Sequence, residues 1–524
     1  MTVAAPAIEL SEITKVFGAL RANDGVSFRV EKGSIHGIVG ENGAGKSTAM
    51  KILYGIYLPE SGEIRVNGVA RRWKTPKDAI RAGIGMVHQH FMLAGPHTVL
   101  DNIVVGAESL WGAKGWRKLI PAIVRPIDRK AARRRLDELA KQYGLPLDWD
   151  APVESLPVGL QQRVEIMKLL YRGADIMILD EPTAVLTPQE TLDLFVNLRK
   201  LRNEGKTILV ITHKLKEVMS HTDRVTVFRA GRVTGEVKTS ETSPQDLADR
   251  MVGRKVVLTV EAPGAAIRDV GAPPALELER LRLERSGERP RLNDVSLRVA
   301  RGEVVGIAGV EGNGQSELIH AILHPREADQ RTSGVVRILG RDVTHFTAGE
   351  IRSLRVGVVP EDRHHEGLLL GRSLTDNFLL GLQRDRRFEN SGWIRGKELK
   401  RATVRALNQY DVRPRLPEAL ASGLSGGNQQ KLIIAREFER QPELLIAAQP
   451  TRGVDVGAIE FIHKRILEAR SQGAGVLLIS SELDEILALS DRILVMYEGA
   501  VVGEFARGQC DEKELGLKMG GAHA

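Results

Sequence analysis

The chain has 524 residues, and its 75 Lys and Arg residues against 67 Asp and Glu residues give a formal net charge of +8. Its 42% of hydrophobic residues exclude a wholly disordered protein, and its length suggests about three or four modules of roughly 150 residues each. The single cysteine, Cys510, excludes an internal disulfide and a cysteine-rich zinc site, and it fits a reducing compartment. The apolar runs are strand-length, and residues 1–9 lack a signal-peptide pattern. We therefore expect a soluble, cytosolic α/β protein.

An internal repeat spans nearly the whole chain. Val26–Val30, followed by a glycine, reappears as Val295–Val299, followed by a glycine, and Gly40 corresponds to Gly309 at the same offset of about 269 residues. Two copies of one domain are therefore predicted. We place them at residues 1–255 and 275–524, joined by a linker at 256–274 that is rich in Ala, Gly and Pro.

Within the first copy, short β-branched runs alternate with helical stretches. This alternation predicts a parallel sheet with helices on both of its faces. A basic stretch between two of these elements fits a solvated helix face, and an anionic partner is the alternative. The predicted strands are 34–39, 176–179 and 207–211, the predicted helices are 48–58 and 188–203, and the basic stretch is 129–135.

A phosphate-binding loop is predicted at Gly40–Ser47, which fits the pattern G-x-x-x-x-G-K-[ST]. Small residues let backbone N–H groups surround phosphate oxygens, Lys46 supplies a cation, and the Ser47 hydroxyl is a candidate Mg²⁺ ligand. The loop lies between a predicted strand and a predicted helix, and the N-terminus of that helix favours an anion.

Polar side chains follow the other predicted strands. The run that begins at Ile176 ends in Asp180, a candidate Mg²⁺ ligand, and Glu181, a candidate base for the attacking water. His213 follows the strand at 207–211 and is a candidate contact of the γ-phosphate, while Gln89 is a candidate metal or water ligand. Each of these side chains alone would more often be structural or solvated. The preceding phosphate loop favours the interpretation that they belong to a nucleotide-binding site.

The second copy contains Leu424–Lys431, in which a Ser and two Gly open a helix. Phosphate loop, signature, acidic strand and histidine occur in the order of the ATP-binding cassette (ABC) family, and both copies resemble that family. The resemblance implies two tandem ABC-type phosphate-loop nucleotide-binding domains. Each would have a parallel-sheet core, an antiparallel β part and a helical subdomain.

The resemblance further implies that ATP is held between the phosphate loop of one copy and the signature of the other. In the first such site, Lys46, Glu181 and His213 would be catalytic. The metal ligands would be Ser47, Gln89 and Asp180. Phe17 would stack on adenine, although a core or loop position is equally open. The ATP-binding set is Phe17, Gly40, Glu41, Asn42, Gly43, Ala44, Gly45, Lys46, Ser47 and Thr48 with Ser425, Gly426, Gly427 and Asn428.

The second site is predicted to be catalytically inactive. The loop lysine, the acidic pair, the histidine and the signature serine are all replaced, which should leave no carboxylate for Mg²⁺ or water, and Pro157 also removes a backbone N–H. We therefore expect one ATP hydrolysed per closure. The replacing residues are Gln315, Ala448, Gln449, Ser481 and Pro157, with Glu361 at the position of Gln89.

Function follows from the resemblance. Two fused cassettes, a short linker and a degenerate second site resemble the ATPase subunit of bacterial simple-sugar and nucleoside importers. The nucleoside branch is resembled most by Gly309–Leu318, Met86–Leu93 and Ala447–Gly453, and this resemblance implies purine nucleosides as the cargo. The implied partners are two integral-membrane permeases and an extracytoplasmic binding protein, without nucleic acid, at the cytoplasmic face of the cell membrane. ATP and Mg²⁺ are the implied cofactors.

Alternatives remain open at this stage. His90–Pro96 is predicted to contact the permeases, or else to be a buried loop. The cargo could be a monosaccharide. A soluble tandem cassette acting on ribosomes or nucleic acid is a different class of function. A phosphate-loop kinase or GTPase would leave the signature motifs without a role, and no guanine-reading Asn-Lys-x-Asp is apparent.

Overall fold

The computed structural model describes residues 5–18, 20–89, 91–108, 127–184, 186, 188–257, 271–284, 290–310, 312–325 and 331–521. The chain divides into two compact units, residues 1–256 and 257–524, and each is described by itself. Of the predicted linker at 256–274, residues 258–270 lie outside the described ranges. Among the described helices, none combines the length and the apolarity that crossing a membrane requires.

The first unit is built on a six-stranded sheet with the order β10-β9-β3-β8-β7-β6. β3 (Ile35–Gly40) pairs in parallel with β8 and β9, and the strand pairs β8/β7 and β7/β6 are also parallel, whereas β10 is antiparallel at the edge. Every residue of β3, β7 and β8 is buried, as their continuous apolar sequences predict. The predicted strands and parallel sheet are thus confirmed.

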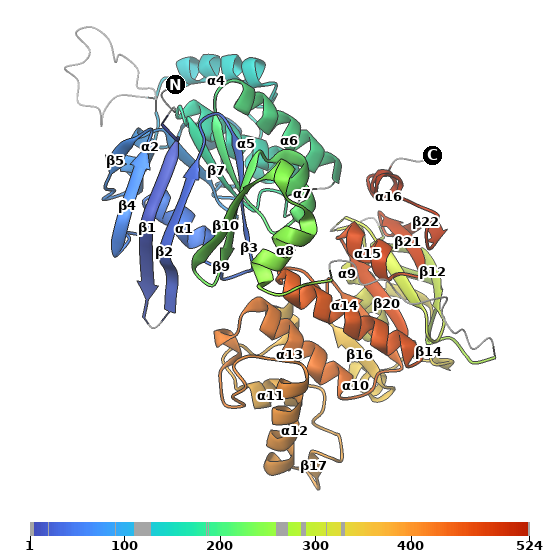
Figure 1. Ribbon diagram of the computed structural model, residues 1–524. Helices are drawn as coiled ribbons and strands as arrows, with labels where there is room; N and C mark the ends of the chain where they lie inside the picture. The colour runs from blue at the N-terminus through green and yellow to red at the C-terminus, as the bar shows by residue number, and fades with distance from the viewer. Residues whose placement is uncertain are drawn as a thin grey trace. The chain divides into compact units, whose positions relative to one another are not determined.

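A second, antiparallel sheet with the order β2-β1-β4-β5 completes the β part of this unit (Figure 1). The strands of the unit are β1 Ile8–Phe17, β2 Leu20–Val30, β3 Ile35–Gly40, β4 Ser61–Val66, β5 Val69–Arg71, β6 Ile84–Val87, β7 Ile176–Asp180, β8 Thr207–Ile211, β9 Arg224–Arg229 and β10 Arg232–Lys238. Its helices are α1 Lys46–Leu53, α2 Pro76–Arg81, α3 Val99–Val104, α4 Arg129–Tyr143, α5 Val158–Tyr171, α6 Pro188–Asn203, α7 Leu215–His221 and α8 Pro244–Val252.

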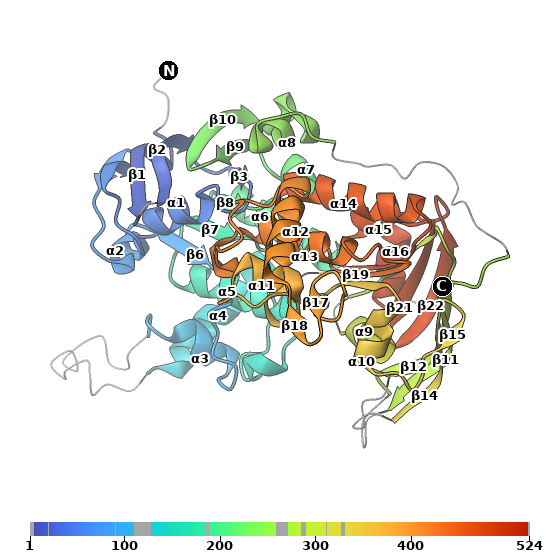
Figure 2. The same ribbon diagram turned by 90° about the horizontal axis from the view of Figure 1, so that it is seen from below.

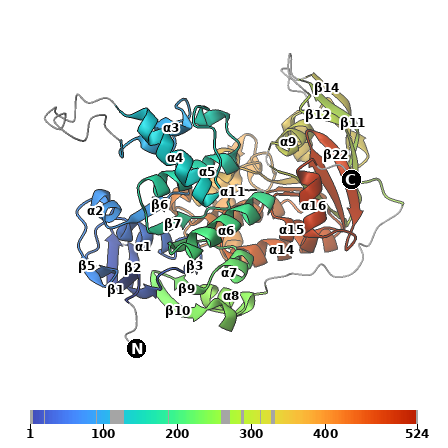
Figure 3. The same cartoon turned by 90° about the horizontal axis from the view of Figure 1, so that it is seen from above.

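Two sequence expectations for helices have different outcomes. The helix expected at 48–58 begins at Lys46 and ends at Leu53, because Gly55 follows with a left-handed φ of 83°. The basic stretch 129–135 lies on α4, which packs beside α3 and α5 in the helical part of the unit (Figure 3). Within this stretch Arg129 pairs with Asp101 at 2.7 Å and Arg133 pairs with Asp150 at 2.9 Å.

The second unit repeats the same topology. Its six-stranded sheet has the order β16-β19-β20-β13-β21-β22, which matches β6-β7-β8-β3-β9-β10 strand for strand, and its antiparallel sheet is β12-β11-β14-β15. Its strands are β11 Leu276–Glu284, β12 Leu292–Val299, β13 Val304–Ala308, β14 Arg331–Ile338, β15 Arg341–Asp342, β16 Val356–Val359, β17 Glu389–Asn390, β18 Trp393–Ile394, β19 Leu444–Ala448, β20 Gly475–Ser480, β21 Arg492–Tyr497 and β22 Ala500–Ala506.

The helices α11, α12 and α13 pack on one another as a helical group, and α13 also contacts β16 at the edge of that sheet (Figure 2). The helices of the unit are α9 Gln315–Leu323, α10 Ala348–Ser353, α11 Leu374–Leu379, α12 Gly396–Gln409, α13 Gly426–Phe438, α14 Val456–Ser471, α15 Leu483–Leu489 and α16 Glu512–Met519, with a π-helical turn η5 at Arg363–Gly367. Each unit therefore has the predicted sheet core, antiparallel β part and helical part.

The parallel sheet also explains why distant motifs meet. In the first unit β3, β6, β7 and β8 are neighbours in one sheet, and their carboxyl ends lie at one edge. The phosphate loop, Gln89 and His213 come after β3, β6 and β8, and Asp180 is the last residue of β7. In an open parallel sheet this edge is where ligands bind.

Candidate active site

The phosphate loop of the first unit joins β3 to α1. Gly45 caps α1 with φ 97°, and a Cβ there would meet the Ala22 carbonyl and the Asn23 amide, so the turn requires glycine. The cap supplies no side-chain acceptor, which leaves the first backbone N–H groups of α1 to an anion. The local sequence thus builds a phosphate cradle.

Lys46 lies over this loop with its side chain buried. Its Nζ donates to the Gly40 carbonyl at 2.7 Å and to the Glu41 carbonyl at 3.0 Å. Burial lowers the pKa of Lys46, and the charges of Glu181, Asp180 and Glu41 oppose that shift only in part. The cation is therefore held where phosphate oxygens would stabilise its charged form.

The hydroxyl and carboxylate expected to bind Mg²⁺ lie together. Ser47 Oγ donates to Asp180 Oδ1 at 3.3 Å. Burial raises the pKa of Asp180, although its hydrogen bond from Ser47 and the charges of Lys51 and Lys46 act against this. A buried carboxylate beside a hydroxyl is a set of hard oxygen donors that suits Mg²⁺ and would be stabilised by it.

Glu181 is held by two predicted site residues. Gln89 Nε2 donates to Glu181 Oε2 at 2.9 Å, and His213 Nδ1 lies 3.2 Å from Glu181 Oε1. Burial raises the pKa of Glu181, but its hydrogen bond and charge interaction with His213, together with the charge of Lys46, bring the net shift below the usual value. Glu181 thus favours the ionised form that a general base requires.

Phe17 and the stretch His90–Pro96 are the remaining predicted residues of the first unit. Phe17 ends β1, is 41% exposed and packs edge-on against Tyr57 at 5.1 Å between ring centroids. In the stretch His90–Pro96, His90 lies outside the described residues, while Met92 is 68% exposed and its backbone N–H donates to buried Glu165. An exposed stacking position for Phe17 and an accessible segment around Met92 fit the expectations but do not assign their ligands.

The second unit keeps the loop and loses its cation. Gln315 begins α9 where Lys46 begins α1, and its Nε2 donates to the Val310 carbonyl at 3.1 Å. The expectation that this half-site keeps no carboxylate is wrong. Ser316 Oγ donates to Glu361 Oε2 at 2.6 Å, so Glu361, which follows β16, supplies the carboxylate that Ala448 lacks.

The counterpart of the Glu181–His213 pair in the second unit is neutral. Gln449 Oε1 accepts hydrogen bonds from Ser481 Oγ and from the Ser481 N–H, both at 3.1 Å. An amide and a hydroxyl at these positions cannot take a proton from water at neutral pH. Gln449 and Ser481 therefore offer no general base where the first unit has Glu181 and His213.

The intact signature lies at the start of α13 in the second unit. Ser425 caps the helix, and its Oγ accepts from Asn428 Nδ2 at 2.9 Å. The Arg413 N–H donates to Asn428 Oδ1 at 2.8 Å, and Asp455 caps the following α14. Ser425, Gly426, Gly427 and Asn428 therefore form one ordered turn, whose pairing with the first unit's loop stays a prediction.

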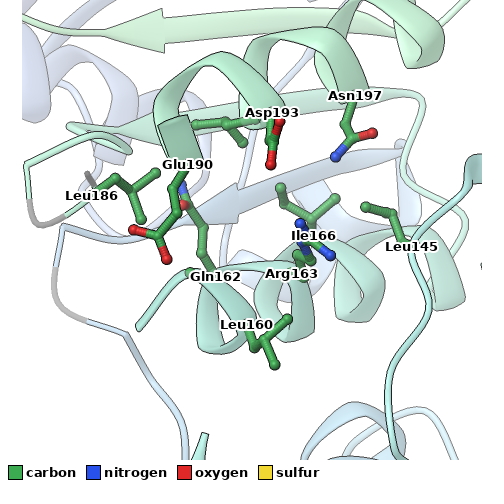
Figure 4. Close-up of a pocket in the computed structure, with 11 residues that line it drawn as sticks. Leu145, Leu160, Gln162, Arg163, Ile166, Leu186, Glu190, Asp193 and Asn197 are labelled. Atoms are coloured by element: carbon green, nitrogen blue, oxygen red, sulfur yellow. The ribbon is translucent and has the colours of Figure 1, made fainter. Parts of the chain in front are cut away.

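The divergent signature of the first unit differs at the same place. Pro157 caps α5 without a side-chain acceptor, and a Cβ on Gly159 would collide with the Glu190 carboxylate of α6. A cavity of about 60 Å³ lies between these two helices and is lined by Glu190 and Asp193 of α6 and by Arg163 of α5 (Figure 4). A carboxylate of the chain itself thus lies at the helix N-terminus, where the helix dipole favours negative charge.

Each unit has a glycine-rich loop at the carboxyl edge of its own parallel sheet, and the loop of the first unit is accompanied by a lysine, a hydroxyl, an acid and a base. These features define a phosphate-loop nucleotide-binding protein. The chain matches the family described as "ABC transporter" over residues 23–184 and again over residues 292–452. The chain belongs to the ABC transporter family.

Three relatives cover nearly its whole length. The nucleoside import ATP-binding protein NupA of Lactococcus lactis subsp. cremoris is 43% identical and covers 98% of each chain. The guanosine import ATP-binding protein NupO of Bacillus subtilis is 44% identical over 98% of this chain and 97% of its own. The glucose import ATP-binding protein TsgD13 of Haloferax volcanii is 46% identical over 98% of this chain and 96% of its own.

Sequence reasoning missed two residues that the structure places beside the signature turns. Glu190 lies against Gly159, and Arg363 lies against Gly426. For Arg363 a signal existed, since the segment from Glu361 to the helix cap Ser373 is three residues longer than its counterpart from Gln89 to Thr98. Nothing in the sequence of α6 distinguishes Glu190 from a solvated helix residue.

Proposed function

We propose that this chain is the ATP-hydrolysing subunit of an ABC importer for nucleosides, in particular purine nucleosides. The observation that carries the proposal is the full hydrolytic set of the first unit in a chain 43–44% identical, over nearly its whole length, to nucleoside and guanosine import ATP-binding proteins. The family accounts for ATP hydrolysis, and the relatives' names support the cargo.

In the proposed mechanism the loop Gly40–Ser47 binds the phosphates, and Lys46 neutralises their charge. Glu181 takes the proton of the attacking water, while Gln89 and His213 orient its carboxylate. Ser47, Asp180 and Gln89 would hold Mg²⁺, which would supply positive charge to offset the negative charge that develops on the phosphate. The turn Ser425–Asn428 would complete the site against the nucleotide held by the first unit.

The second half-site does not hydrolyse in this scheme. Gln315 has no charge, and Gln449 accepts hydrogen bonds from Ser481 but cannot act as a base. A general base alone contributes about 10²–10⁴ in rate, so its loss together with that of the lysine should abolish turnover there. The second unit then serves hydrolysis through its signature.

We propose two integral-membrane permeases and an extracytoplasmic binding protein as partners, with the chain at the cytoplasmic face of the membrane. The exposed Met92, in the segment after Gln89, supports this segment as the permease contact. A monosaccharide cargo is the second candidate, because the glucose import relative is 46% identical. The relatives' import functions give no support to a ribosomal or nucleic-acid role.

Uptake of labelled guanosine, uridine and glucose tests the cargo in a strain that lacks this chain. We expect loss of guanosine uptake, restored by the wild-type gene and not by Glu181→Gln. Glucose uptake lost while nucleoside uptake persists would replace the cargo with a sugar. Retention of all three would contradict the importer itself.

A further inference from the structure

Arg363 occupies a special place in the second unit. It opens the π-helical turn η5, which directly follows Glu361 and Asp362 at the end of β16. Asp362 caps this turn by accepting hydrogen bonds from the His364 and His365 N–H groups. The side chain of Arg363 is half-buried, and its Nε is buried without a hydrogen-bond partner among the described residues.

The guanidinium holds the loop that follows β19. Its Nη1 donates to the Arg452 carbonyl at 2.7 Å, and its Nη2 donates to the Gly453 carbonyl at 3.4 Å. Gly453 has a left-handed φ of 65°, so this loop has an unusual backbone that two charge-assisted hydrogen bonds can fix.

The same guanidinium borders the signature turn. A Cβ on Gly426 would lie 2.8 Å from Arg363 Nη2 and 3.0 Å from the Gly453 carbonyl, so the turn packs directly on this clamp. One residue along η5, His364 Nε2 lies 3.0 Å from Oε1 of buried Gln429, on the first turn of α13. The η5 segment thus contacts the start of α13 through two successive side chains.

In the part of the first unit that the structure describes, neither this arginine clamp nor an intact signature is present. Its shorter segment carries Phe91 two residues after Gln89, where the second unit has Arg363 two residues after Glu361. Its signature positions are Pro157 and Val158. The arginine therefore accompanies the signature that the proposed mechanism uses.

We infer that Arg363 is a positioning residue for ATP hydrolysis, because it fixes the shape of the turn Ser425–Gly427 through the Arg452 and Gly453 carbonyls. This inference rests on the proposed function, since the turn must complete the hydrolytic site. A displacement of about 1 Å in a site can cost about 100-fold in rate, so a loosened turn should lower kcat.

The test compares Arg363→Ala and Arg363→Lys with a matched control, Arg440→Ala, in the full chain. Arg440 follows the other end of α13, and its guanidinium also donates to two carbonyls, those of Gly381 and Arg352. ATPase kcat and KM are measured together with the thermal unfolding midpoint.

We expect Arg363→Ala to lower kcat at least about tenfold, with KM for ATP nearly unchanged because Lys46 and its loop belong to the other unit. Arg440→Ala should lower the thermal unfolding midpoint about as much as Arg363→Ala does, but it should leave kcat within about twofold of the wild-type value. Arg363→Lys should have intermediate activity, because an ammonium keeps the charge without the fork that reaches two carbonyls.

Equal activity of Arg363→Ala and Arg440→Ala would overturn the inference, as would full activity of Arg363→Lys. Should Arg363→Ala not fold, Arg363→Lys decides alone. The proposed function fails separately, namely if the wild-type chain hydrolyses no ATP or if Glu181→Gln remains active.

Discussion

Gln449 repeats the backbone of Glu181 without its charge. Each residue directly follows a buried strand and has a left-handed φ, 45° for Gln449 and 48° for Glu181. Each also donates its N–H to a carbonyl near the end of the neighbouring strand: Gln449 to Ile479 at 2.7 Å, and Glu181 to Ile211 at 2.9 Å. Such backbones cost about 1–3 kcal/mol and persist where a site requires them. The second unit has therefore kept the architecture of a hydrolytic site and lost only its chemistry.

Glu181→Gln should abolish ATP hydrolysis by the full chain. The substitution makes the first unit resemble the Gln449 site, and loss of a general base lowers the rate by about 10²–10⁴. Phosphate release from ATP measures it. Gln449→Ala is the matched control and should leave at least about half of the activity, because the Gln449 side chain accepts hydrogen bonds from Ser481 and carries no charge. Equal losses in the two variants would refute the asymmetry.

Lys46→Ala should abolish hydrolysis, whereas Gln315→Ala should not. Lys46 is the buried cation of the first loop, and Gln315 is neutral at the same position of α9. ATP binding, followed by calorimetry, should be weakened by the first substitution because the phosphates lose their cation. If Gln315→Ala lowered the rate of ATP hydrolysis as much as Lys46→Ala, the second loop would take part in hydrolysis, which contradicts the proposed mechanism.

Much of the fold follows from the sequence because the signals are local and repeated. Buried strands read as continuous apolar runs, and the loop Gly40–Ser47 must lie between a strand and a helix. The repeat at a constant offset then predicts the second unit from the first. The end of α1 was misjudged, since the pattern continues past Leu53 while Gly55 ends the helix.

The site was less completely predictable, because its remaining contacts depend on tertiary structure. The hydrogen bond from Ser316 to Glu361 joins residues from two neighbouring elements, and counting residue replacements predicted instead that no carboxylate remained. Likewise, Arg363 reaches Gly453 across 90 residues of chain. Such contacts arise from sheet order, which periodicity alone does not specify.

Ser47→Ala should raise the Mg²⁺ concentration that half-maximal hydrolysis requires. Its Oγ lies 3.3 Å from Asp180 and is one of the hard oxygen ligands in the proposed metal site. Titration of ATPase activity with Mg²⁺ measures the shift. Chelation by EDTA should abolish the activity of the wild-type chain and of the Ser47→Ala variant. Ser316→Ala removes the hydroxyl bound to Glu361 and should leave the Mg²⁺ dependence unchanged. A shift of the same size in Ser316→Ala would place the catalytic metal elsewhere.

The free energy of unfolding of the first unit should fall as the pH falls below about 6.5. Part of that fall should come from His36, which takes up one proton when the chain unfolds. His36 lies on β3 at 0% exposure, with Nε2 2.7 Å from Thr226 Oγ1. Burial, followed by the charge of Arg224, lowers the pKa of His36 to about 3 from a usual 6.5. Between these values the unfolded chain binds a proton that the folded chain does not, so the free energy of unfolding falls by about 1.4 kcal/mol per pH unit.

The second unit provides the matched replacement for this histidine. In the corresponding strand pair, Val305 and Leu494 stand where the first unit has His36 and Thr226. The double substitution His36→Val and Thr226→Leu should therefore reduce the fall in stability between pH 6.5 and pH 5 by about 2 kcal/mol, as measured by urea unfolding. An unchanged pH dependence would show that His36 is protonated in the folded chain or that other groups dominate the acid loss.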